Sequence, residues 1–145
     1  MKLLKNKIFF IFIVGFNFLF IRQAAAQLTV AGGLTPTQLV QNVLIGSGIT
    51  VNNVVYTGAD TAIGTFNGTA SNIGLSYGVI MTSGDRTVAP GPNTQSGAGY
   101  DNNQSGDASL DLLTTSSTYD AAVLEFDFIP ISNTVSVRYV TPEFY

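Results

Sequence analysis

The chain has 145 residues, a formal net charge of −3, and neither cysteine nor histidine. The lack of cysteine excludes disulfides, thiolate nucleophiles, cysteine-zinc sites and lipid attachment through an N-terminal cysteine. The lack of histidine excludes Ser-His and Cys-His catalysis and removes the commonest metal ligand. Carboxylates, hydroxyls and amides remain as functional groups, and these oxygen-bearing groups suit calcium.

Residues 1–26 have the order of a cleavable secretory signal peptide: three early lysines, an apolar run over 8–21, and three alanines ending at Ala26. The apolar run is 14 residues long, whereas a membrane-spanning helix needs about 20, so a permanent membrane span is the weaker alternative. We therefore expect cleavage near Ala26 and a protein that is secreted or held at the cell surface. Residues 27–145 hold nine acidic and two basic residues, a formal charge of −7. This excludes nucleic acid as a natural partner, because phosphate contacts need clustered lysine and arginine.

A short helix is predicted from about Pro36 to Ile45. Thr35 can cap this helix, Pro36 suits its first position, and Gln38 completes a capping box. Apolar residues then recur at helical spacing, and Gly46 follows as a stop signal. The apolar stripe is narrow, which favours packing of the helix against a sheet over binding of a partner.

From Gly48 the sequence changes to short β-branched and aromatic runs separated by turn residues, which is typical of successive strands. One early helix followed by several short strands predicts a mainly β fold, an antiparallel β-sandwich, in a single domain over 27–145. The candidate strands are Ile49–Thr57, Ala62–Phe66, Gly78–Ser83, Ala121–Ile129 and Thr134–Val140.

The last two candidate strands are predicted to form a hairpin. The apolar positions that would share one of its faces are Leu124, Phe126 and Phe128 on the first strand and Val135, Val137 and Tyr139 on the second. A turn over 130–133 would place position 128 opposite 135, 126 opposite 137 and 124 opposite 139. The same register places Asp127 opposite Ser136 and Glu125 opposite Arg138 on the other face, so we predict a Glu125 to Arg138 cross-strand pair.

The segment Ala89–Ser109 is rich in Gly, Pro, Asn and Ser and predicts a long surface loop, a kind of segment that is often functional. Here oxygen-bearing side chains recur as in the first half of a calcium loop. The candidate calcium ligands are Asp101, Asn103, Asp107 and Asp111. Leu112 stands where an EF-hand needs a glutamate, which excludes a true EF-hand. The half-matched motif favours the alternative, a set of turns in which these side chains bond their own backbone.

Glu125 and Asp127 lie on one face of a candidate strand, about 6.5 to 7 Å apart. That separation falls within the range of inverting glycoside hydrolases. Any exposed strand face with two acids meets the same condition, and nothing nearby in the sequence would tune either carboxyl group. A carboxylate-based glycoside hydrolase is therefore only an alternative, and the sequence favours a protein that is not an enzyme.

Several segments look familiar when they are taken together and in order. They are Leu39–Val51, Ile63–Phe66, Asn72–Leu75, Gly78–Ile80, Thr82–Asp85, Ser105–Asp107 with Leu110, and Tyr119–Phe128. This series resembles the choice-of-anchor L domain of exported bacterial surface proteins of the Bacteroidetes type. The resemblance implies an exported domain that is tethered through varied C-terminal anchors or secreted, with adhesion or matrix roles and no established activity.

The end of the chain departs from this resemblance, because the segment Tyr139–Tyr145 is shorter than the family's usual continuation. We therefore expect a domain that is incomplete at its C-terminal end. Missing strands would leave an unpaired sheet edge, which invites association with another chain.

The favoured function is a noncatalytic exported binding or adhesion module whose partner is a protein or a glycan surface. Tyr77, Tyr100 and Tyr119 could stack on sugar rings, although packing at strand edges is the favoured interpretation. The alternatives are the glycoside hydrolase and a structural spacer within a larger surface protein. The sequence predicts no certain cofactor beyond the candidate calcium, and neither the partner nor the oligomeric state.

Overall fold

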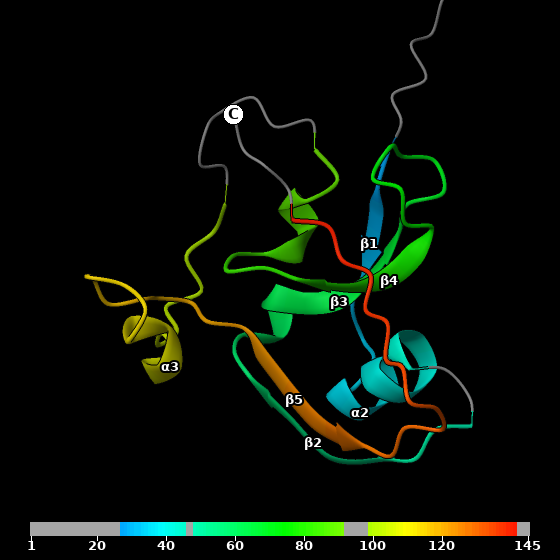
Figure 1. Cartoon of the computed structure of the whole chain (residues 1–145). Helices are drawn as coiled ribbons and strands as arrows, with labels where there is room; N and C mark the ends of the chain where they lie inside the picture. The colour runs from blue at the N-terminus through cyan, green and yellow to red at the C-terminus, as the bar shows by residue number, and fades with distance from the viewer. Residues whose placement is uncertain (1–26, 46–47, 92–98, 142–145) are drawn as a thin grey trace, which may run out of the picture.

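The computed structural model of the chain describes residues 27–45, 48–91 and 99–141, which form two antiparallel sheets with a helix beside them (Figure 1). The three-stranded sheet has the order β1-β3-β4, and the two-stranded sheet pairs β2 with β5. The strands are β1 (Thr29–Ala31), β2 (Val51–Thr57), β3 (Ile63–Asn67), β4 (Tyr77–Met81) and β5 (Val123–Phe128). The predicted mainly β class with antiparallel sheets is confirmed.

The predicted N-terminal helix forms in two connected pieces, α2 (Pro36–Leu39) and the π-helical turn η1 (Val40–Leu44). Its capping box is complete: the Gln38 amide donates to Thr35 Oγ1 at 3.2 Å, and the Thr35 amide donates to Gln38 Oε1 at 2.9 Å. These bonds satisfy amides that have no partner inside the helix. The predicted stop residue, Gly46, lies outside the described residues.

The core lies where this helix meets the sheets. Leu39 and Val40 are fully buried, and β3 contributes the buried side chains of Ile63 and Phe66. The helix contacts β2 of the two-stranded sheet through α2 and β4 of the three-stranded sheet through η1. Its narrow apolar stripe therefore packs against both sheets and joins them, as the sequence predicted for a helix that packs on a sheet.

The Arg86 side chain binds the backbone at the start of β3 and just before it. Its Nη1 atom donates to the carbonyl oxygens of Asp60 at 2.8 Å and Ile63 at 3.2 Å, while its buried Nε has no hydrogen-bond partner among the described residues. The side chain passes so close to Gly64 that a Cβ there would lie 2.7 Å from Arg86 Cδ and 2.3 Å from the Ala31 carbonyl oxygen. Glycine is therefore required at position 64 by close approach of two other groups.

The predicted hairpin at the end of the chain is wrong. Residues 134–140 form no strand, and β5 pairs instead with β2, with Val55 opposite Glu125. The Arg138 side chain donates to the carbonyl oxygen of Gly74 at 3.2 Å, so the predicted Glu125 to Arg138 pair is absent. After β5 the chain bends over 131–133 and runs past α2 toward the three-stranded sheet (Figure 1). Side-chain alternation predicted which strand faces would match, but it did not predict the direction that the chain takes after β5.

Three short helical turns complete the described secondary structure: η2 (Asp60–Ala62), η3 (Arg86–Val88) and α3 (Ala108–Asp111). Residues 1–26, the predicted leader, lie outside the described residues. In the part of the chain that the structure describes, no helix is long and apolar enough to cross a membrane.

Candidate functional site, the acidic lobe

Residues 99–121 form a projection that we call the acidic lobe. It includes α3 and stands away from the two sheets, between the loop that follows η3 and the start of β5 (Figure 1). Its base is tied to the body through Asn102, whose Oδ1 accepts from Thr61 Oγ1 at 2.9 Å. The lobe contains the predicted calcium ligands and part of the predicted long loop, so it holds most of the candidate chemistry.

Asp120 closes the base of the lobe. Its two carboxylate oxygens accept hydrogen bonds from the backbone amides of Gln104, at 2.8 Å, and Asn102, at 3.2 Å. Its own amide donates to the Gln104 carbonyl oxygen at 3.1 Å, and an isolated β-bridge joins Ser105 to Tyr119 beside it. The Asp120 carboxylate thus accepts from two backbone amides that would bond a neighbouring strand in a sheet. It holds together the two arms of the lobe, residues 102–107 and 118–121, although they form no sheet.

Asp107 and Asp111 fix the outer half of the lobe. Asp107 caps α3, because its Oδ1 accepts from the amides of Ser109 at 2.9 Å and Leu110 at 3.0 Å. Asp111 Oδ1 accepts from both the amide and the hydroxyl of Thr118, at 2.6 and 2.7 Å. These two bonds lower the pKa of Asp111 from its ordinary value, since they favour the ionised carboxylate.

Gly106 allows the two arms of the lobe to meet. A Cβ at this position would lie 2.0 Å from the Thr118 carbonyl oxygen. The neighbouring Asp107 amide donates to Thr118 Oγ1 at 3.0 Å, which holds the backbones at this short distance. The approach is possible only for a residue without a side chain.

The four predicted calcium ligands are spread along the lobe. Asp101 Oδ1 accepts from the Asn103 amide at 2.7 Å in a tight turn, and Asn103 has a positive φ of 53°. Asp107 and Asp111 lie four and eight residues after Asn103 and bond the amides already described. Each of the three carboxylates therefore already accepts at least one backbone hydrogen bond, which is the pattern of the alternative interpretation. Among the described residues, no three or more His, Cys, Asp or Glu gather closely enough to hold a metal ion, and the calcium site stays a prediction.

The same lobe exposes large apolar side chains. Leu112 is 86% exposed, Leu113 is 82% exposed and Tyr119 is 77% exposed, and Tyr100 and Leu110 are also exposed. Sequence reasoning treated the polar loop as the functional segment and considered Leu112 only as a mismatch to a calcium loop, not as a contact residue. The signal of the exposed leucines was three leucines within four positions, next to a polar segment and outside any strand pattern.

The family model described as the choice-of-anchor L domain matches residues 29–142, which is most of the chain. The chain belongs to the choice-of-anchor L domain family. No curated protein and no solved structure matches it significantly. Membership confirms the resemblance drawn from the ordered segments and marks the chain as an extracellular surface module.

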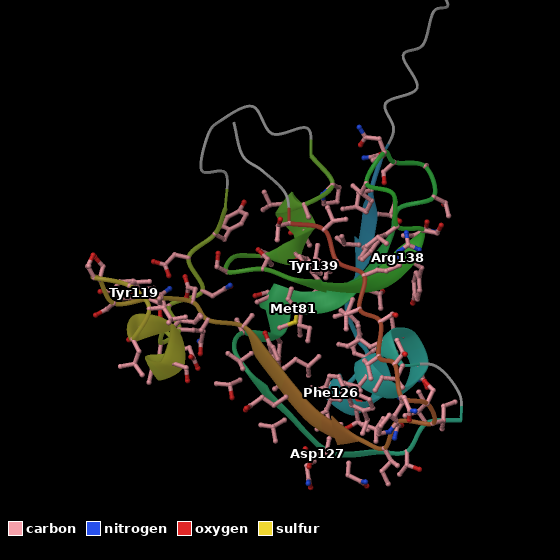
Figure 2. The ribbon with its side chains drawn as sticks, viewed as in Figure 1. Met81, Tyr119, Phe126, Asp127, Arg138 and Tyr139 are labelled. Carbon is pink, nitrogen blue, oxygen red and sulfur yellow. The ribbon has the colours of Figure 1, made fainter. Side chains whose placement is uncertain are left out.

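The carboxylates of the hydrolase alternative lie elsewhere in this choice-of-anchor L domain. Glu125 and Asp127 are exposed on the outer face of β5, and Figure 2 shows Asp127 pointing away from the body. Asp127 Oδ2 accepts from Asn53 Nδ2 at 2.6 Å, at a point where the pairing of β2 with β5 is irregular. Glu125 faces the exposed Val55 across the ladder. The two acids thus lie on an open strand face, and the family description names no enzymatic activity.

Proposed function

We propose that this choice-of-anchor L domain is a noncatalytic exported module that binds a protein or glycan surface through the acidic lobe. The observation that carries the proposal is a contrast within the lobe. Aspartate hydrogen bonds fix its backbone at Asp107, Asp111 and Asp120, while the leucines at 112 and 113 are left in water. Exposed apolar groups on an ordered projection are typical of interaction sites, because burying them against a partner is favourable and costs little ordering entropy.

The charge of the lobe limits the class of partner. The lobe carries Asp101, Asp107, Asp111 and Asp120 and no basic residue, and residues 27–145 carry a formal charge of −7. A phosphate-rich partner would be repelled, whereas a neutral glycan or a neutral to basic protein surface would not. Exposed Tyr100 and Tyr119 suit either partner, since tyrosine combines an apolar ring with a polar hydroxyl.

The test is a binding screen of the protein purified after export, against a glycan array and against cell-surface extracts, followed by measurement of affinity for each ligand found. We expect the double substitution Leu112→Ser with Leu113→Ser to weaken binding about tenfold or more, since each removes an apolar contact. The matched control is Ile131→Ser, which changes a side chain that is 79% exposed but lies outside the lobe. The control should bind as the wild type does.

Two results would contradict the proposal. If the double variant keeps full affinity for every ligand found, binding does not use the leucines of the lobe. If the wild type binds nothing on the glycan array or in the cell-surface extracts, the result favours the structural spacer over a binding module. The thermal melting of both variants should match that of the wild type, because all three side chains are exposed.

A further inference from the structure

The segment 134–140 has the pattern of a strand but no strand partner. Its residues are all exposed, and no backbone–backbone hydrogen bond joins it to another part of the described chain; the Thr134 backbone bonds only the nearby Ser132 hydroxyl. Val137 is 77% exposed and Tyr139 is 79% exposed, and they alternate with Ser136 and Arg138. A segment with alternating β-branched residues, whose amides and carbonyls have no strand partner, readily adds to the edge of a sheet.

A matching edge lies on the same chain. β5 pairs with β2 on one side, and its other side has no strand partner among the described residues. Its half-buried Leu124, Phe126 and Phe128 lie on one face, with exposed Glu125 and Asp127 on the other. Paired antiparallel with 134–140, so that position 126 meets 137, β5 would extend its apolar face. The same pairing would place the Arg138 guanidinium beside the Glu125 carboxylate.

The described chain does not make this pairing within itself. Figure 2 shows Arg138 and Tyr139 away from Phe126 and Asp127, and Arg138 lies next to the connection between β3 and β4. Residues 134–140 are held only weakly in this position. Arg138 makes one side-chain hydrogen bond there, to the exposed carbonyl oxygen of Gly74 at 3.2 Å. Each copy of the chain thus carries both an unpaired segment with the pattern of a strand and the sheet edge that complements it.

We propose that two copies of this protein associate by strand exchange, in which residues 134–140 of each copy add to the free edge of β5 in the other. The arrangement is isologous, so a twofold axis satisfies both strands and both edges at once. Charge complementarity sets the register, since Arg138 of one copy meets Glu125 of the other and a slip by one residue would place charge on the apolar face. The association does not depend on the acidic lobe, so the binding function and the exchange can fail separately.

The absence of cysteine in the chain permits a direct test with introduced cysteines. Residues opposite each other in an antiparallel ladder have Cβ atoms about 4.5 to 5.5 Å apart, close to the reach of a disulfide. Two single variants, Glu125→Cys and Arg138→Cys, are purified, mixed and oxidised. We expect a disulfide-linked dimer in the mixture and little in either variant alone. Glu125→Cys mixed with Val137→Cys is the control, since position 137 would lie on the opposite face and should not react.

The remaining outcomes overturn the proposal. If the double variant Glu125→Cys with Arg138→Cys closes as a monomer and the mixture gives no dimer, the pairing is a hairpin within one chain. If neither reacts, residues 134–140 do not pair with β5 in this register. A wild type that sediments as a monomer at every accessible concentration would also refute the exchange.

Charge reversal gives an independent measurement. Arg138→Glu should raise the dimer dissociation constant about tenfold, because two like-charge pairs replace two attractive ones in the symmetric dimer. Adding Glu125→Arg to the same chain should restore dimer formation. An unchanged dissociation constant in Arg138→Glu, or a failure of the double reversal to restore it, would contradict the register.

Discussion

The body of the domain and the acidic lobe are held together by opposite means. In the body, Leu39, Val40 and Phe66 are buried where the helix joins the two sheets. In the lobe, the carboxylates of Asp107, Asp111 and Asp120 bond backbone amides, and the large apolar side chains point into water. The body is therefore stabilised by apolar burial, while the lobe is ordered by hydrogen bonds and leaves its large apolar side chains exposed.

The largest expected effect comes from the body. Leu39→Ala should lower the free energy of unfolding by about 2 to 5 kcal/mol, because it removes buried methyl groups and leaves a cavity. Leu112→Ala removes the same atoms from an exposed side chain of the lobe and should change that free energy by no more than about 0.5 kcal/mol. Urea unfolding of both variants measures the difference. Similar losses for the two would mean that the lobe leucines are buried in solution and that the contrast is wrong.

A smaller effect is expected from acid, which should weaken the hydrogen bonds that Asp111 makes in the lobe and leave the apolar core of the body unchanged. The pKa of Asp111 is lowered by the hydrogen bonds from Thr118, so the folded lobe favours the ionised form. The stabilisation is complete above the unfolded value of about 3.9 and is lost as the pH falls through the lowered pKa. The protection of the Thr118 amide, which is its hydrogen-exchange rate compared with the intrinsic rate at the same pH, should therefore fall in acid.

The control for this pH dependence is Asp111→Asn, in which the Thr118 amide should lose its acid response. Asp85 provides a reference within the same chain, because its bonds from Thr87 lower its pKa in the same way. The Thr87 amide should keep its acid response in the Asp111→Asn variant. If the Thr118 amide responds to acid equally in both proteins, Asp111 does not control the lobe.

Local signals predicted those features that depend on neighbours in the sequence. The capping box needs only Thr35 and Gln38, three residues apart, and it forms as expected. Four of the five candidate strands overlap observed strands, because alternation and β-branched residues report directly on extended structure. Strand β1 (Thr29–Ala31) was missed, since three residues are too few to show a period.

Features that depend on distant parts of the chain could not be predicted in this way. Alternation in 134–140 predicted a strand whose apolar face would match that of β5, but the segment forms no strand, because alternation contains no information on where the chain goes after residue 133. The role of Asp120 was also missed, because its partners at Asn102 and Gln104 are 18 and 16 residues away. The candidate site was found only in part: Asp101, Asp107 and Asp111 were identified as a group, but Asp120, the backbone partners of these aspartates and the exposed leucines were not.

The smallest expected effect concerns calcium, which would bind in the lobe and not in the body. Asp101, Asp107 and Asp111 already accept backbone hydrogen bonds, so a calcium ion would have to share their oxygens with amides. We therefore expect any calcium affinity to be no tighter than about 10⁻³ M, the weak limit of extracellular modules. Calorimetric titration of the exported protein, with Asp101→Ala as a comparison, measures this affinity. Micromolar binding that Asp101→Ala abolishes would reverse the comparison, because the lobe would then be ordered by a metal ion and not by its own aspartate turns.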